Sequence, residues 1–266
     1  MTIAGRMLRD RRRSMVWWTL GAVALVVFTV ALYPAVKDQT EMQELVAEMP
    51  GAVKAMIGYD AAVPVTSPPG YLQARLFSTI APVLMLVFGI GVGAQAIGGL
   101  EESGELEPLL ANPVTRDRVA AERYLAAVTL LAALTVLFTV VTVAVAAAVD
   151  ALGGVSRTGL LGACAAMFAL AALHLSLAYA VGAATGRRGP AVGVATAVAL
   201  GGYLVYNLLP LVPALAPLRF ATPWHWYLQR NMLVHGVPPA AILAPVGLSV
   251  LVALAGWLAF RRRDLR

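Results

Sequence analysis

YLAAVTLLAALTVLFTVVTVAVAAAV, residues 124–149, is the stretch that decides the fold of this 266-residue chain. It contains no charged residue, and it is longer than the about 20 apolar residues that a helix needs to cross a bilayer. Lipid offers the backbone no hydrogen-bond partners, and the strict alternation of a barrel strand is absent, so a membrane-spanning segment of this kind must be helical. The stretch therefore predicts a transmembrane helix.

Five further uncharged apolar stretches of similar length occur along the chain. The six expected spans are residues 15–33, 76–99, 124–149, 160–184, 190–209 and 239–260. The composition agrees, with 60% hydrophobic and 13% charged residues, and it excludes both a soluble enzyme and a second, water-soluble domain. We expect one all-α integral membrane domain over residues 1–266, with six transmembrane helices.

The basic residues set the expected orientation. With six spans both termini share one side of the membrane, and 14 of the 20 basic residues fall on that side. The positive-inside rule makes this side the cytoplasm. We therefore expect a multi-pass protein of the plasma (inner) membrane with both termini cytoplasmic and an extracytoplasmic loop at residues 34–75. The net charge of +6 does not indicate a nucleic-acid partner, because the arginines lie mostly at the ends of spans.

Polar side chains are few inside the expected spans, and none of them is Asp, Glu, Lys or Arg. Buried ionisable residues mark proton and ion relays, so a proton-driven transporter is disfavoured. Polar residues in spans more often hydrogen-bond a neighbouring helix, and lining a transport pathway is the alternative. The candidates for such a pathway are Thr135, Thr139, Thr142, His174, Tyr203, Tyr206 and Asn207.

Neither catalysis nor metal binding is indicated. The chain has no HExxH motif, no Asp inside a span and no GxxxxGK[ST] loop for nucleotide phosphates. His174 and Ser176 are two residues apart on a helix, so they point to different faces and cannot form a base and nucleophile pair. His225 and His235 have no carboxylate or thiol near them in sequence. We expect no catalytic and no metal site.

Small residues indicate where helices approach closely. Gly89 and Gly93 are four residues apart in the second expected span, which is the spacing of a small-xxx-small helix contact. Cys164 is the only cysteine, and we expect it to be a small buried apolar side chain.

The segment before the last span is rich in proline and aromatic residues. Four prolines precede or begin the run Trp224-His225-Trp226-Tyr227. This composition predicts broken or re-entrant helical pieces whose aromatic side chains rest at the level of the lipid headgroups.

The loop between the second and third spans, residues 101–123, reads EESGELEPLLANPVTRDRVAAER. Acidic residues come first and leucines follow, which is typical of a short helix with one apolar edge, acidic where the helix dipole favours negative charge. Pro113 breaks this helix. An apolar edge rimmed by charge on a cytosolic loop suggests docking to a protein, and a membrane-surface helix that stabilises its own bundle fits equally well.

Residues 101–116 resemble the cytosolic loop of ABC-2 type permeases, whose usual form is close to EExxGTLExLLxxPVSR. This chain departs from that form at Glu105, where Thr is common, and at Pro108 inside the leucine run. Six spans, an arginine-rich N-terminal surface helix, the aromatic loop before the last span and the ending FRRRD at residues 260–264 are also similar to the family.

The resemblance implies a permease subunit of an ABC exporter. Its implied partners are two copies of an ABC ATPase, a second permease copy in a homodimer, and membrane lipid. The chain itself would bind no cofactor, because ATP and Mg would bind to the ATPase. The residues implied in ATPase coupling are Glu101, Glu102, Gly104, Glu105, Leu106, Glu107, Leu109, Leu110, Pro113, Thr115 and Arg116.

The expected activity is efflux, and a pathway without ionisable residues favours an amphipathic or hydrophobic cargo. The alternative is an ATPase-independent helical membrane scaffold or a lipid-interacting subunit.

Overall fold

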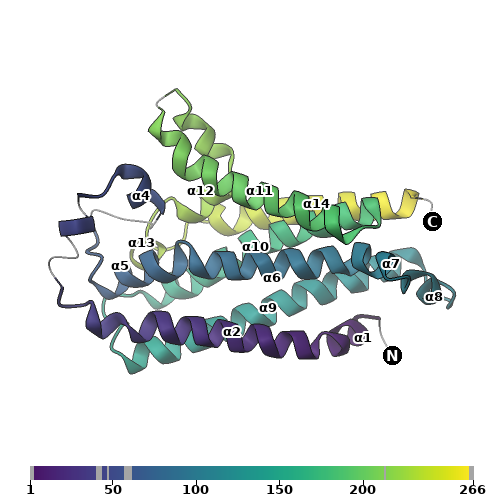
Figure 1. Cartoon of the computed structure of the whole chain (residues 1–266), viewed down its shortest axis with the longest axis horizontal. Helices are drawn as coiled ribbons and strands as arrows, with labels where there is room; N and C mark the ends of the chain where they lie inside the picture. The colour runs from purple at the N-terminus through teal and green to yellow at the C-terminus, as the bar shows by residue number, and fades with distance from the viewer. Residues whose placement is uncertain (1–2, 40–43, 47, 57–61, 213, 264–266) are drawn as a thin grey trace.

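The chain folds into an elongated bundle of long helices, shown in Figure 1. This computed structural model describes residues 3–39, 44–46, 48–56, 62–212 and 214–263, so Asp264 of the expected basic ending lies outside it. The described residues contain no strand, and six of their helical segments are long and apolar enough to cross a membrane. The predicted all-α membrane fold with six spans is confirmed.

The six spanning segments together contain most of the helices. Their bounds are Arg12–Ala35, Pro68–Glu102, Arg116–Ala148, Arg157–Thr185, Arg188–Leu208 and Ala240–Arg262. In chain order they hold α2 (Arg12–Ala31), α5 (Pro68–Leu72), α6 (Ile80–Ala94), α7 (Leu100–Glu102), α9 (Arg116–Ala148), α10 (Arg157–Thr185), α11 (Arg188–Leu208) and α14 (Ala240–Arg262). The shorter helices outside them are α1 (Ile3–Asp10), α4 (Gly51–Met56), α8 (Leu106–Leu110), α12 (Pro223–Leu228) and α13 (Met232–His235).

Five of the six spanning segments begin earlier than the uncharged runs of sequence suggest, and the shift is largest for the second and third segments. The second starts at Pro68, where the hydroxyl of Ser67 accepts a hydrogen bond from the backbone N–H of Gly70 at 3.3 Å. The third starts at Arg116, where the hydroxyl of Thr115 accepts one from the backbone N–H of Arg118 at 3.2 Å. Capping side chains set the ends of these helices, so the helices extend into charged turns beyond the apolar run.

The segment of α6 and α10 form the centre of the bundle. Of the residues in their most apolar windows, 67% and 72% are buried, whereas each of the other four spans has fewer than 40% buried. α10 packs against α6, α9, α11 and α14. The outer helices carry exposed apolar side chains, such as Trp17 and Phe28 of α2, as expected for surfaces that face lipid.

Glycines allow the central helices to approach closely. A Cβ atom added to Gly93 would lie 2.3 Å from the carbonyl oxygen of Leu175, and one on Gly89 would lie 3.2 Å from another α10 carbonyl oxygen. The predicted small-xxx-small contact is therefore confirmed, and its partner is α10. On the other side of α10, a Cβ atom on Gly256 of α14 would lie 2.5 Å from the Cα atom of Ala180.

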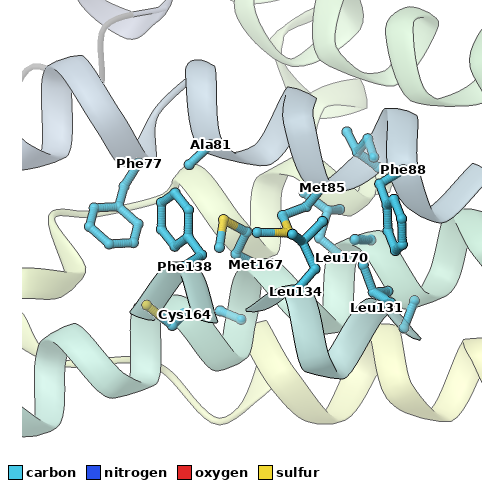
Figure 2. Packing of buried hydrophobic residues seen from close by; sticks show 14 of the residues in the cluster. Phe77, Ala81, Met85, Phe88, Leu131, Leu134, Phe138, Cys164, Met167 and Leu170 are labelled. Carbon is cyan, nitrogen blue, oxygen red and sulfur yellow. The ribbon is translucent and has the colours of Figure 1, made fainter. Parts of the chain in front are cut away.

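Aromatic and sulfur-containing side chains fill the space between α6, α9 and α10, as Figure 2 shows. The rings of Phe77 and Phe138 meet edge to face with centroids 6.3 Å apart. Cys164 is buried with a free thiol, which confirms its predicted role as a small core side chain.

The aromatic segment before the last span forms the short helix α12, in agreement with the prediction of broken helical pieces. Two of its aromatic side chains form hydrogen bonds with other helical segments. The indole N–H of Trp224 donates to the carbonyl of Ala199 at 2.8 Å, and the hydroxyl of Tyr227 donates to the carbonyl of Phe77 at 2.7 Å. Both side chains are buried in the bundle, because carbonyls inside it satisfy their polar atoms.

Candidate functional site

Residues 101–116, which we call the acidic loop, lie at the end of the bundle that holds both termini (Figure 1). We call this the terminal end. The chain leaves α7, turns at Gly104 with a φ of +72° and then forms α8. The backbone N–H of Glu105 donates to the carbonyl of Leu100 at 3.0 Å and closes the turn. Glycine suits this position because a side chain is strained at positive φ.

The leucines of the acidic loop point mainly toward the bundle. Leu106 is 1% exposed and belongs to an apolar cluster with Val119 and Phe260. Leu109 and Leu110 are half-buried against the same cluster. The apolar edge expected from the sequence exists, and its first leucine anchors the loop to its own helices.

The exposed surface of the acidic loop is mostly acidic and polar. Glu102, Glu105 and Glu107 are exposed, and Pro108 and Pro113 are exposed beside them. Gly104 and Thr115 are also exposed, whereas Glu101 and Arg116 are half-buried. A partner that approaches this loop would therefore meet glutamates before it meets leucines.

Polar contacts tie the acidic loop to two other spans. Glu101 forms an ion pair with Arg263 just after α14, and the guanidinium of Arg116 donates to the carbonyl of Arg263 at 2.9 Å. The carboxylate of Glu102 accepts a hydrogen bond from the backbone N–H of Arg188 at the start of α11, at 3.0 Å. Because the loop also joins α7 to α9, it is connected to four of the six spans.

Arg123 stabilises the helix that leads into the acidic loop. Its side chain is buried, and it donates to the carbonyls of Ala96 and Gln95 at 2.9 and 3.3 Å. These carbonyls lie in Gln95–Gly99, a π-helical stretch between α6 and α7. Such stretches are rare and often occur at functional sites. Sequence reasoning assigned Arg123 only a topological role, although an arginine directly before an uncharged run is a usable signal.

α1 packs against α9 beside the acidic loop. The backbone N–H of Ala4 donates to the carboxylate of Glu122 at 3.1 Å, and Arg118 forms an ion pair with the same carboxylate at 2.7 Å. A cavity of about 410 Å³ lies between α1, the acidic loop and α9, with Ile3, Leu109 and Arg123 in its lining.

The residues predicted to line a pathway do not share one site. Thr135 and Thr139 line a cavity of about 480 Å³ formed by α9 and α10, and their hydroxyls donate to carbonyls four residues earlier. Tyr203 lines a different and larger cavity. The remaining candidates, which are buried or half-buried elsewhere, are Thr142, His174, Tyr206 and Asn207.

The larger cavity, of about 570 Å³, is a groove between α2, α6 and α11. Its polar lining includes Arg11, Ser14 and Arg188 at the terminal end, and Tyr203 and Trp224 lie toward its far end. We call it the α2/α11 groove. Sequence reasoning missed it because only the packing of three distant segments brings these residues together.

The comparison with known families now decides the class of protein. A family model described as "ABC-2 family transporter protein" matches residues 1–265. The chain belongs to the ABC-2 transporter family. The resemblance seen in the acidic loop is thereby confirmed, and the permease role and the multi-pass membrane location follow from the family and the six spans. No curated protein matches the chain.

ABC-2 permeases are the membrane subunits of transporters, and they are generally not catalytic themselves and in general work with an ABC ATPase. In this ABC-2 permease the described residues include no group of His, Cys, Asp and Glu side chains that could hold a metal ion. The terminal end thus combines an acidic surface, contacts to four spans and an adjoining groove.

Proposed function

We propose that this chain is the membrane-spanning permease of an ABC exporter for an amphipathic or hydrophobic compound in the plasma membrane. A second copy of the chain completes the transporter, and two copies of a separate ABC ATPase supply the energy by binding ATP and Mg. The acidic loop carries this proposal, because it combines contacts to four spans with three exposed glutamates. The terminal end faces the cytoplasm, in line with the excess of arginines at the span ends on that side.

In this proposal the acidic loop transmits force from the ATPase to the helices. A displacement of the loop acts on α14 through Glu101 and Arg263, and on α11 through Glu102 and Arg188. α11 and α6 also form two walls of the α2/α11 groove. Movement at the loop would therefore change the width of a groove that has an apolar lining over most of its length.

Charge reversal tests the docking role of the acidic loop. We expect the double variant Glu105→Lys and Glu107→Lys to lower ATPase association and transport at least about tenfold, because like charges across an interface cost several kcal/mol. Co-purification of the ATPase with the tagged permease measures the association. Both glutamates are exposed, so the change should leave membrane insertion intact.

The matched control is the double variant Glu44→Lys and Glu48→Lys, which makes the same charge change at exposed positions in the loop between the first two spans. It should retain full association. Leu109→Asp and Leu110→Asp are also expected to abolish association, but both leucines pack on the bundle, so they separate docking from folding less cleanly. Equal ATPase recovery with both double variants would refute docking at the acidic loop.

The second candidate function is an ATPase-independent membrane scaffold or a lipid-interacting subunit, which the α2/α11 groove would suit. Uptake of an amphipathic drug into inverted membrane vesicles separates the two functions. The exporter predicts accumulation that requires ATP, and the scaffold predicts none. Transport restricted to strongly anionic sugars would overturn the proposed cargo class.

A further inference from the structure

Two arginines face the α2/α11 groove at the terminal end. Arg11 lies directly before α2 and Arg188 begins α11, and both line the groove together with Ser14. Burial, and then the charge of Arg188, lower the pKa of Arg11, although an arginine remains protonated at neutral pH.

In the described part of the chain, neither Arg11 nor Arg188 forms an ion pair with an acidic side chain. The ion pairs formed there involve other arginines, namely those at positions 118, 261 and 263. The nearby carboxylate of Glu102 accepts a hydrogen bond from the backbone N–H of Arg188, so it satisfies the start of α11. Two like charges therefore meet at the mouth of a cavity, which favours a negatively charged group between them.

Beyond the arginines the lining becomes apolar. The groove continues past Val87, Val192 and Leu200 to the rings of Tyr203 and Trp224. From Arg188 to Tyr203 the axis of α11 rises about 22 Å, at about 1.5 Å per residue. This length corresponds to one leaflet of a bilayer, with about 15 Å of hydrocarbon and about 6 Å of headgroup region. The groove thus has a cationic mouth and an apolar interior of leaflet depth.

We propose that the α2/α11 groove binds one anionic phospholipid from the leaflet at the terminal end, with its phosphate between Arg11 and Arg188 and an acyl chain along α6 and α11. Guanidinium groups bind phosphate oxygens through strong charge-assisted hydrogen bonds, and the hydroxyl of Ser14 is a further donor at the same mouth. A choline headgroup would bring an additional positive charge to the pair and bind less well. The site is a property of this chain and does not depend on an ATPase.

Neighbouring tryptophans on α2 allow a direct test. Trp18 lines the groove, whereas Trp17 is 73% exposed on the outside of the helix. Two single-tryptophan proteins are placed in phosphatidylcholine vesicles that contain a minor fraction of brominated phosphatidylglycerol. One protein keeps only Trp18 and the other keeps only Trp17, and Phe replaces every other tryptophan in each. We expect stronger quenching of Trp18 than of Trp17. Brominated phosphatidylcholine at the same fraction should show no such excess at Trp18.

Four arginine variants then locate the headgroup. Arg11→Gln or Arg188→Gln should each lower the preference for phosphatidylglycerol at Trp18 about fivefold. Arg13→Gln and Arg187→Gln remove the same charge from exposed neighbours outside the groove lining and should leave the preference unchanged. Equal effects of all four substitutions would show that the preference comes from general surface charge and would overturn the site. Equal quenching of Trp17 and Trp18 would also overturn it.

A glycine in the groove tests the acyl chain. A Cβ atom on Gly91 meets nothing within 4 Å, so Gly91→Leu should fold and fill the groove. It should reduce quenching of Trp18 by brominated phosphatidylglycerol to the level of Trp17. Unchanged quenching would contradict binding along α6.

A second measurement avoids the tryptophan substitutions. Proteins with all native tryptophans, carrying Arg11→Gln or the control Arg13→Gln, are purified from membranes in mild detergent, and the retained phosphatidylglycerol is measured by mass spectrometry. The control should retain about one molecule per chain and Arg11→Gln should lose it. Equal retention would overturn the proposal.

Discussion

α10 and α11 are consecutive apolar helices that pack against each other, yet they have opposite surroundings. In the most apolar window of α10 72% of the residues are buried, and in that of α11 only 22%. The difference lies in whether glycines bring the backbone of a neighbouring helix into close contact. α10 receives Gly93 from α6 and Gly256 from α14 at backbone contact distance, whereas Gly193 and Gly201 of α11 have nothing within 4 Å of an added Cβ atom.

This comparison separates two roles for spans that look alike in sequence. α10 is the fixed centre of the bundle, because its closest contacts are between backbones that cannot give way. α11 forms a wall of the α2/α11 groove, donates a hydrogen bond from its first residue to the acidic loop and is covered in part by α12. We therefore expect α10 to stay in place and α11 to move when the acidic loop is displaced.

The largest expected effect comes from adding one methyl group at the centre. In Gly93→Ala the new Cβ atom would lie 2.3 Å from the carbonyl oxygen of Leu175, so the backbones of α6 and α10 must separate. We expect a loss of about 2 kcal/mol or more in stability, seen as an apparent melting temperature several degrees lower in detergent.

The control for this change is Gly193→Ala on α11, where the added atom meets nothing. It should leave the melting temperature unchanged or raise it slightly, because alanine favours a helix over glycine. If both variants melt at the same temperature, the distinction between the two helices is wrong.

A smaller effect is expected where α12 holds α11. The indole N–H of Trp224 donates to the carbonyl of Ala199, and its ring contacts that of Tyr203 edge to face at 4.8 Å. Trp224→Phe should cost about 1 kcal/mol and speed hydrogen exchange at the α11 amides near Ala199, with no change in α10. Trp226→Phe, at a half-buried ring beside it, is the control. Faster exchange in α10 alone would contradict the prediction.

The smallest expected effect is a pH dependence of the contact between α12 and α11, where the rings of His225 and Tyr206 have centroids 6.1 Å apart. Burial, and then the charge of Arg219, lower the pKa of His225 on α12 below its ordinary value of about 6.5. The unfolded chain then binds more protons as the pH falls through about 6.5, so the stabilisation is complete above that pH and decreases below it.

Melting curves at several pH values measure this effect. Acidification should lower the melting temperature of the wild type more than that of His225→Gln. His235→Gln, at an exposed histidine, should keep the wild-type acid sensitivity. A wild-type response in His225→Gln would assign the pH dependence to other groups.

The sequence was sufficient for those features that depend on composition and local spacing. Uncharged runs predict the spans because the bilayer demands them, and the spacing of Gly89 and Gly93 predicts a helix contact that the structure confirms. The acidic loop was found from its own pattern of residues. The sequence could not show that Leu106 is buried, because that depends on Phe260 at the far end of the chain.

The polar sites were the least predictable part of the molecule. The seven pathway candidates were chosen as polar residues inside spans, but only Tyr203 lines the α2/α11 groove. The arginines at the mouth of that groove come from segments separated by most of the chain, and each taken alone indicates only orientation. The site exists only because the fold places α2, α6 and α11 around one groove, and no local pattern encodes it.

The central claim is that an ABC ATPase drives this bundle through the acidic loop. The most direct test is purification of the tagged permease from its native membrane in mild detergent, followed by mass spectrometry of stoichiometric partners. The account predicts a polypeptide with a GxxxxGK[ST] nucleotide-binding loop at about one copy per permease, lost in the Glu105→Lys and Glu107→Lys variant. A permease that is recovered intact and without such a partner in several detergents would contradict it.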